Sequence, residues 1–253
     1  MSFAQSVASL LLSGSLLLTG ALDTAAPQNA NGVMMLVNRD WRISSEFYPQ
    51  VRMTAVPGQV RQLQDVSAAA MEALFAAAKQ EAGVTLISVS GYRSYSRQQT
   101  IYARKLKRSG GSVAKADLTV ARPGASEHQT GLSMDIGQKN ATGSTLSTAF
   151  AKAKGGIWVA ENCWRFGFIV RYPDGEEAHS VTGYTYEPWH LRYIGLENAK
   201  KMHDSGETIY ERFLIRERTD RLFSLVSAGE TLVAVAEPGP ELPEELLELP
   251  EDW

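Results

Sequence analysis

Four residues in two short segments have the types and spacing needed for metal-dependent chemistry. The first segment, SEHQTGLSMDIG (residues 126–137), contains His128 and Asp135. The second, YEPWH (residues 186–190), contains Glu187 and His190. Imidazole nitrogens and a carboxylate oxygen suit Zn²⁺, and catalytic zinc sites commonly take three protein ligands and leave one position for water. His128, Asp135 and His190 are therefore candidate zinc ligands.

The carboxylate of Glu187 is placed to act as a base beside such a metal. Pro188 excludes a regular helix interior, so this segment differs from the helical H-E-x-x-H arrangement. We expect a loop that enters a strand, with Trp189 and His190 pointing to opposite faces. Zinc lowers the pKa of a coordinated water toward about 7, and a nearby carboxylate can accept its proton.

Each of these residues alone also has an ordinary structural explanation. His190 could be a packed core histidine, Asp135 could brace a turn, and Glu187 could be a loop carboxylate. The joint occurrence of S-x-H-x(6)-D and, later, E-P-W-H favours a site over these explanations.

The elements that must position these residues are a mixture of helices and strands. Helices are predicted at residues 65–82, 96–109, 147–166, 196–206 and 208–226. The first is rich in alanine with apolar residues at helical spacing, can be capped by Asp65 or Ser67, and ends at Gly83. The second begins with a capping box of Ser96 and Gln99, and the third is interrupted or joined at Gly155–Gly156. Short β-branched or apolar runs predict strands at residues 34–37, 84–90, 132–137, 168–173 and 189–195.

These elements do not alternate as regular βαβ units, which favours an α+β domain with a small sheet covered by helices. We expect a single domain of this class at residues 31–230. Residues 1–30 resemble an export signal through the apolar run Val7–Leu22, although residues 1–6 lack Lys and Arg, and an irregular or helical extension is the alternative. Residues 231–253 are expected to form an acidic Pro/Glu-rich tail.

Composition narrows the possible functions. The chain has 253 residues, 44% hydrophobic and 21% charged, with a formal net charge of -3, so no nucleic-acid partner is expected. Its single cysteine, Cys163, cannot form an intrachain disulfide and is predicted to be a buried apolar residue. No stable membrane span is expected beyond the possible export segment, and we expect an extracytoplasmic location, secreted or associated with the cell wall.

Three segments carry a family resemblance. SGYRSYSRQQ, PGASEHQTGLSMDIG and TGYTYEPWHLRYIG resemble, in order, the signature blocks of the VanY-type zinc D-alanyl-D-alanine carboxypeptidases. That family includes L,D-carboxypeptidases of peptidoglycan and is related to the VanX-type dipeptidases. The resemblance spans about residues 36–216. It implies a D,D-peptidase/hedgehog-like α+β fold, with a small, mainly antiparallel sheet flanked by helices and the zinc site on the sheet face.

The resemblance also implies a role for each matching residue. His128, Asp135 and His190 would bind Zn²⁺, and Glu187 would be the catalytic base. Arg93 would stabilise the oxyanion or bind the substrate carboxylate, with a structural salt bridge as the alternative. Ser126 and Gln98 match family positions that line the substrate pocket, and Trp189 and Tyr186 are further candidates for substrate binding at its wall. The alternatives are a turn serine for Ser126, a helix-surface glutamine for Gln98, packing beneath the metal for Trp189 and aromatic core packing for Tyr186.

The function expected from the resemblance is removal of a C-terminal D-alanine from peptidoglycan stem peptides or their precursors. Alternatives are a peptidoglycan endopeptidase, a D-Ala-D-Ala dipeptidase of the same superfamily, and a non-catalytic, metal-stabilised module that binds the cell wall. A serine D,D-peptidase mechanism is disfavoured, because we find neither Gly-x-Ser-x-Gly nor Ser-x-x-Lys in a suitable setting.

Overall fold

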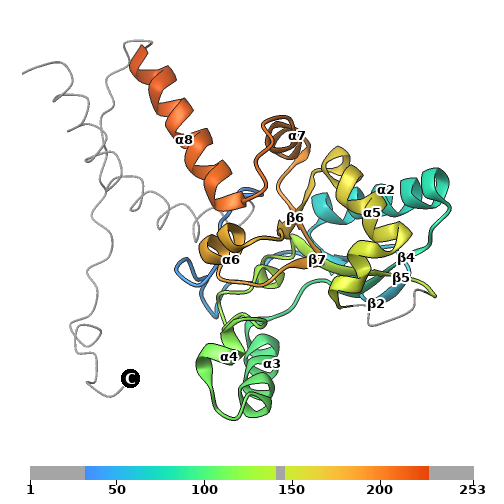
Figure 1. Cartoon of the computed structure of the whole chain (residues 1–253), viewed down its shortest axis with the longest axis vertical. Coiled ribbons are helices and arrows are strands. Elements are labelled where there is room, and N and C mark those ends of the chain that lie inside the picture. Colours follow the sequence, from blue (N-terminus) through green and yellow to red (C-terminus); the bar gives the residue numbers. More distant parts are fainter. Residues whose placement is uncertain (1–31, 141–145, 228–253) are drawn as a thin grey trace, which may run out of the picture. The chain divides into compact units, whose positions relative to one another are not determined.

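A five-stranded sheet positions the candidate residues (Figure 1). The computed structural model describes residues 32–140 and 146–227. The strand order is β2 (Gly58–Val60), β4 (Leu86–Ser90), β5 (Ser133–Gln138), β7 (Glu187–Tyr193) and β6 (Phe168–Tyr172). β2 is parallel to β4, and the other neighbours are antiparallel. Two further strands, β1 (Arg52–Met53) and β3 (Gln62–Leu63), pair with each other. The expected α+β class with a small, mainly antiparallel sheet is confirmed.

Helices surround this sheet. The α-helices are α2 (Asp65–Ala82), α3 (Tyr95–Arg108), α4 (Val113–Asp117), α5 (Lys154–Asn162), α6 (Glu176–Thr182), α7 (Leu196–Asp204) and α8 (Tyr210–Ser227). Short 3-10 helices are η1 (Glu127–Thr130), η2 (Thr148–Lys152) and η3 (Cys163–Phe166). The described residues up to Ile215 form one compact unit, and the last part of α8, from Arg216 on, belongs to a second. Among the described helices, none combines the length and apolar character needed to cross a membrane.

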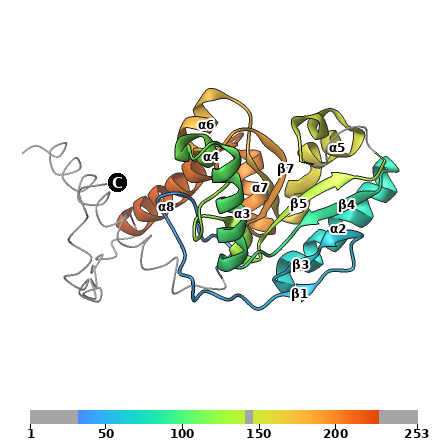
Figure 2. The same ribbon diagram turned by 90° about the horizontal axis from the view of Figure 1, so that it is seen from below.

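One face of the sheet packs into the main core. Side chains alternate along a strand, and Met134 and Ile136 of β5 point to the same side as Leu191 of β7. They pack with residues of α2 and α5, which lie next to each other in Figure 1. Helices α3 and α4 lie side by side, away from α2 and α5 (Figure 2). Consequently, the neighbouring residues Asp135 and His190 face the opposite side of the sheet.

A second apolar cluster packs on part of that opposite side. It contains Leu36, Ile169 and Ile194 with residues of α7 and the first turns of α8. The prediction of a strand at residues 34–37 is wrong. The guanidinium of Arg192 donates to the backbone carbonyls of Val33 and Met35, so a side chain holds this segment where a strand partner was expected.

The predicted helices at residues 65–82 and 96–109 are present, but they begin differently. Gly83 ends α2 with φ of 66°, as expected. Neither Asp65 nor Ser67 caps its start, because the Ser67 hydroxyl donates to the carbonyls of Gln64 and Gly131 instead. α3 is capped by Ser94, whose hydroxyl accepts from the amide of Arg97, so Ser96 lies inside the helix.

The segment between β5 and β6 also differs in detail from its prediction. The interruption falls at Ala153, between η2 and α5, whereas Gly155 and Gly156 lie in the first turn of α5. A side chain at Gly156 would bring a Cβ to 1.8 Å from the carbonyl oxygen of Phe150, so close packing requires glycine there. Cys163 is buried as predicted, and burial raises the pKa of its thiol to about 12.

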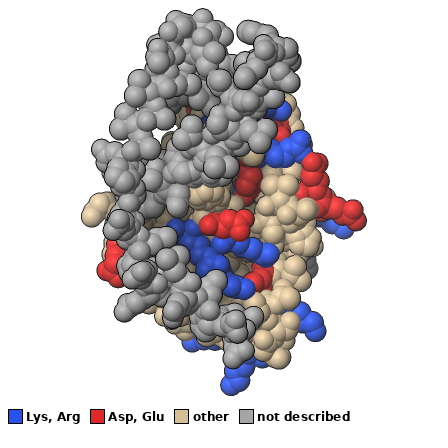
Figure 3. All heavy atoms as spheres, turned by 90° about the vertical axis from the view of Figure 1, so that its left-hand side faces the viewer, with Lys and Arg blue, Asp and Glu red and all other residues tan. Residues whose placement is uncertain are grey.

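Acidic and basic side chains are mixed on the face shown in Figure 3, where Lys and Arg gather beside Asp and Glu. In the unit that ends at Ile215, Arg212 of α8 forms ion pairs with Glu177 of α6 and with Glu207. The predicted export segment (residues 1–30) and acidic tail (residues 231–253) lie outside the described residues.

Candidate metal centre

The register between β5 and β7 places two of the candidate ligands opposite each other. Asp135 pairs directly with His190 across the antiparallel strands, and Ser133 pairs with Arg192. Directly opposed residues on one face have Cβ atoms about 4.5–5.5 Å apart, so their side chains can meet. The Nδ1 atom of His190 lies 3.0 Å from Oδ1 of Asp135.

The third candidate ligand is held by a short turn before β5. His128 lies in η1, which ends at Gly131 with φ of 69°. The Thr130 hydroxyl donates to the carbonyl of Glu127 and accepts from the amide of Leu132, which closes this turn. The chain therefore reverses at Gly131, and His128 turns back over β5 toward Asp135.

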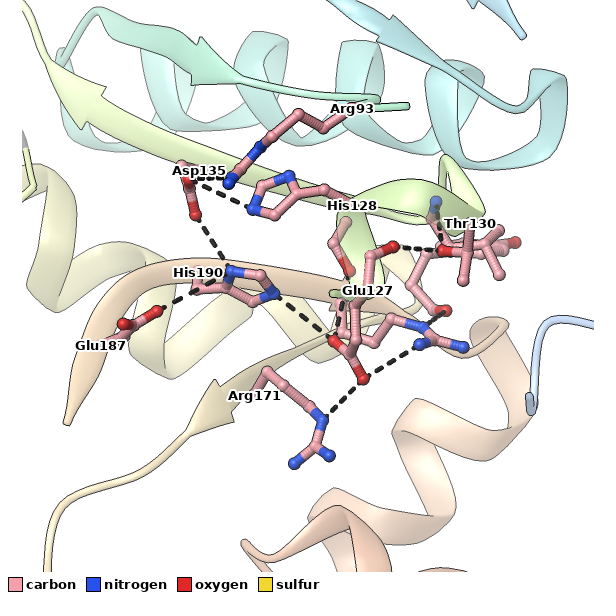
Figure 4. Close-up of polar contacts among 12 residues, drawn as sticks. Arg93, Glu127, His128, Thr130, Asp135, Arg171, Glu187 and His190 are labelled. Carbon is pink, nitrogen blue, oxygen red and sulfur yellow. Dashed lines mark hydrogen bonds and ion pairs between the residues drawn. The ribbon is translucent and has the colours of Figure 1, made fainter. Parts of the chain in front are cut away.

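The three candidate ligands converge. One ligand atom from each of His128, Asp135 and His190 lies within 4.8 Å of the others, and all three residues are buried. Nε2 of His128 is 3.2 Å from Oδ2 of Asp135, and the two imidazole rings meet edge to face with centroids 4.9 Å apart. Figure 4 shows His128, Asp135 and His190 pointing toward one another.

The outer nitrogen of each imidazole is also engaged. Nδ1 of His128 lies 2.8 Å from the carbonyl oxygen of Gly91, and Nε2 of His190 lies 3.4 Å from Oε2 of Glu127. Histidines that bind metals usually donate their other N–H to such an acceptor, which leaves the inward nitrogen free to bind. Two oriented imidazoles and one carboxylate are a donor set that fits Zn²⁺.

Glu187 reaches the same group because β7 is irregular. Residues three apart on a regular strand point to opposite faces. However, the register between β6 and β7 shifts between Val170–Leu191 and Tyr172–Glu187, so β7 holds extra residues there. As a result, Oε2 of Glu187 lies 3.9 Å from Nδ1 of His190.

Arg93 borders the group from the end of β4. Its Nη2 atom is 3.6 Å from Oδ2 of Asp135, and its Nη1 donates to Oε1 of Gln98 at 2.8 Å. The amide nitrogen of Gln98 donates to the carbonyl of Ala121. Gln98 is 1% exposed, so in this structure its amide orients Arg93.

Burial and neighbouring charges shift the pKa values of these groups. Burial raises the pKa of the Glu187 carboxyl from 4.5 to about 7. Burial acts to lower the pKa of His190, but hydrogen bonds to Asp135 and Glu127 outweigh it and raise that pKa to about 9. The pKa of Asp135 is held well below its ordinary value despite burial, because His128 and His190 lie beside its carboxylate.

The remaining predicted site residues, Ser126, Trp189 and Tyr186, differ in their burial and in their position in the fold. Ser126 is buried and immediately precedes η1. Trp189 packs against the main core, on the alternate side of β7 from His190. Tyr186 is half-buried, just before Glu187. Contact of Ser126, Trp189 and Tyr186 with a substrate stays a prediction.

The sequence prediction missed Glu127. Its carboxylate is fully buried and contacts His190 and Arg171 (Figure 4). It also contacts Arg192. A signal was present, since Arg171 interrupts the otherwise apolar strand FIVRY and Arg192 follows the apolar Leu191 in EPWHLRY. A buried arginine requires a buried counter-charge, and a carboxylate beside a candidate ligand could have supplied it.

Known proteins are similar to this chain in sequence. The YodJ protein of Bacillus subtilis (strain 168) is 40% identical over 195 residues, an alignment that covers 74% of this chain and 68% of YodJ. A D-alanyl-D-alanine carboxypeptidase of Enterococcus faecalis (strain ATCC 700802 / V583) is 41% identical over 150 residues. That alignment covers 56% of this chain and 52%, about half, of the relative.

Solved structures are similar as well. The LdcB LD-carboxypeptidase superposes with a TM-score of 0.67 at 38% identity, covering 74% of this chain and 87% of LdcB. The D,D-pentapeptidase VanY, solved in complex with Zn(II), gives 0.60 at 32% identity, covering 72% and 98%. The family described as VanY, D-alanyl-D-alanine carboxypeptidase, matches residues 60–196. With this match and these relatives, the chain belongs to the VanY carboxypeptidase family.

Proposed function

We propose that this chain is a zinc-dependent carboxypeptidase that removes a C-terminal D-alanine from peptidoglycan stem peptides, with Glu187 as the general base. The observation that carries the proposal is the convergence of His128, Asp135 and His190, with Glu187 3.9 Å from His190. A purely structural zinc site would need neither Glu187 nor Arg93.

The relatives add support for the metal and the substrate. VanY was solved with Zn(II), and a related structure is VanYB in complex with D-Alanine-D-Alanine. His128 Nε2, an Asp135 carboxylate oxygen and His190 Nδ1 would hold the ion in this chain. When bound, zinc supplies a Lewis acid that polarises the scissile carbonyl and makes water a stronger nucleophile near neutral pH.

The protein's own groups then handle the proton and the charge. Glu187 takes a proton from the attacking water and passes it to the amide nitrogen of the leaving D-alanine as the C–N bond breaks. A base with a pKa near 7 both accepts and releases a proton readily at neutral pH, and burial raises the pKa of Glu187 to about 7. The Arg93 guanidinium, held by Gln98, is the nearby cation that can stabilise an oxyanion or bind a carboxylate.

A second candidate is cleavage of the L,D bond that ends a tetrapeptide stem. The solved LdcB LD-carboxypeptidase is more similar to this chain in sequence and fold than VanY is, at 38% against 32% identity. Other relatives include the D,D-dipeptidase VanXYg, so release of a dipeptide is a third outcome to be measured.

The test is digestion of defined pentapeptide and tetrapeptide muropeptides by the zinc-loaded protein, with products identified by mass spectrometry. Loss of a single D-alanine is expected, and the stem that loses it identifies D,D or L,D cleavage. Glu187→Gln should keep one zinc per chain by elemental analysis while the rate falls by about 10²–10⁴-fold. Glu176→Gln, an exposed carboxylate on α6, is the control and should retain full activity. Unchanged activity in Glu187→Gln would refute its assignment as the base.

A further inference from the structure

A buried carboxylate lies on the outer side of His190, away from Asp135. Glu127 is 1% exposed, and its Oε2 atom is 3.4 Å from Nε2 of His190. Figure 4 shows the His190 imidazole between the carboxylates of Asp135 and Glu127. The Ser133 hydroxyl, from β5, also donates to Oε2 of Glu127 at 3.3 Å.

Two buried arginines hold this carboxylate in place. Nε of Arg171 lies 2.8 Å, and Nη1 of Arg192 3.0 Å, from Oε1 of Glu127. Both arginine side chains are fully buried. Arg171 also donates to both carboxylate oxygens of Glu211 in α8, at 2.5 and 3.0 Å. The four side chains together carry two negative and two positive charges, so the cluster is neutral as a whole.

Oxygen Oε1 of Glu127 thus faces the arginines, while Oε2 faces Ser133 and His190. An ionised carboxylate only accepts hydrogen bonds, so the His190 nitrogen that faces it, Nε2, must carry a proton. Because Nε2 faces Glu127, Nδ1 is the ring nitrogen whose proton, shared with Asp135 in the metal-free protein, a cation can displace. Nδ1 is also the atom that faces Asp135 and Glu187.

We propose that Glu127 is a positioning residue that fixes the ring orientation and tautomer of His190, so that Nδ1 is presented to the zinc ion. The inference rests on the proposed function for the presence of zinc. Arg171 and Arg192 hold the carboxylate in place, and Glu211 balances the second arginine. Glu127 touches neither substrate nor metal in this role.

The test compares two substitutions that remove one negative charge from the same cluster. Glu127→Gln weakens the contact with His190, whereas Glu211→Gln alters the arginine cluster without touching His190. Both should lower the unfolding temperature of the metal-free protein. The zinc dissociation constant, measured by competition with a chromophoric chelator, should rise about 10–100-fold in Glu127→Gln and stay near the wild-type value in Glu211→Gln.

Equal zinc affinity of Glu127→Gln and the wild type would overturn the inference while leaving the proposed function intact. An equal loss in both variants would also overturn it, because the cluster would then act only through stability. Failure of the wild type to bind zinc would refute the proposed function and the inference together. If Glu127→Gln does not fold, the charge-balanced variant Glu127→Gln/Arg192→Gln takes its place, with Arg192→Gln as its reference.

A second measurement needs no variant. Long-range ¹H–¹⁵N correlation spectra of the zinc-loaded wild type, labelled at histidine, report which ring nitrogen of His190 carries the proton. The proton is expected on Nε2, protected from exchange by burial. A proton on Nδ1 would contradict the proposed orientation.

Discussion

At the scale of single residues, the site concentrates charge where water is excluded. Asp135, Glu187, Arg93 and His190 are all at least half-buried, and each has a neighbour of opposite charge within 4.0 Å. A buried charge is costly unless it is paired or binds a metal. Glu187 is the least compensated of the carboxylates, since burial raises its pKa to about 7 while the pKa of Asp135 falls.

The raised pKa of Glu187 predicts how the stability of the metal-free protein changes with pH. The folded protein binds the Glu187 proton more tightly than the unfolded chain does, so stability falls as pH rises from about 4.5 to about 7. Ionisation of the buried Glu187 side chain then lowers the free energy of unfolding by about 3 kcal/mol. Glu187→Gln, which cannot ionise, should therefore be more stable than the wild type at pH 8 in EDTA, and the gap should close near pH 5.

Urea denaturation at several pH values measures this difference. Glu72→Gln is the control with the opposite sign, because Arg52 lowers the pKa of Glu72. That variant should be less stable than the wild type at pH 8, and its deficit should shrink as pH falls through the lowered pKa. A stability gap for Glu187→Gln that does not depend on pH would contradict the prediction.

At the scale of elements, the site depends on a turn, a strand pair and an irregular strand. η1 and Gly131 bring His128 over β5, the register pairs Asp135 with His190, and the irregularity in β7 turns Glu187 toward His190. Each of these features is set by backbone geometry, so a backbone change in any of them should alter the site without replacing a site residue.

Gly131→Ala is the sharpest such change. The new Cβ would lie 2.8 Å from Cγ1 of Val51 in a left-handed backbone conformation. We expect a loss of more than about 2 kcal/mol of stability in the metal-free protein, together with weaker zinc binding, because His128 and Asp135 flank this turn.

Gly110→Ala is the matched control. Gly110 has a similar φ of 66° but no atom within 4 Å of the added Cβ, so only the backbone cost of about 1–2 kcal/mol applies and zinc affinity should not change. Urea denaturation and chelator competition report the two quantities. Equal losses of stability and of zinc affinity in Gly131→Ala and Gly110→Ala would show that the packing at Gly131 contributes to neither.

Elements with strong local patterns could be predicted from the sequence. Alanine-rich α2 and its final Gly83 fulfil their prediction, as do β4 and β5, because local propensity and tertiary packing agree there. The conformation of residues 34–37 could not be predicted, since it depends on Arg192, which lies 157 positions after Met35 in the sequence. The Arg192 guanidinium donates to the Met35 carbonyl, which a strand partner would otherwise bind. Likewise, the burial of Glu127 depends on arginines from two distant strands.

At the scale of the whole molecule, segments outside the family match complete the site. Residues 60–196 contain Arg93, His128, Asp135, Glu187 and His190. However, Arg192 donates to the carbonyls of Val33 and Met35, and Arg171 pairs with Glu211. The segment before β1 thus provides acceptors for Arg192, and the start of α8 provides the acidic partner of Arg171.

A fragment limited to residues 60–196 should therefore fail to fold, although it retains all the candidate catalytic and zinc-binding residues. It would leave Arg171 and Arg192 without several acceptors and remove Leu36, Tyr210 and Phe213 from their apolar cluster. We expect no cooperative transition by calorimetry and no near-UV circular dichroism for this fragment. A chain of residues 32–227 should unfold cooperatively, like the full chain. Native-like melting of the shorter fragment would contradict this account.

The direct pairing of Asp135 with His190 also has a consequence for the order of assembly. These residues are 55 positions apart, and the register of β5 against β7 alone brings their side chains together. A slip of one residue would turn one of them to the other face of the sheet. We therefore expect uptake of the proposed zinc ion during refolding to follow the formation of the sheet at the same rate.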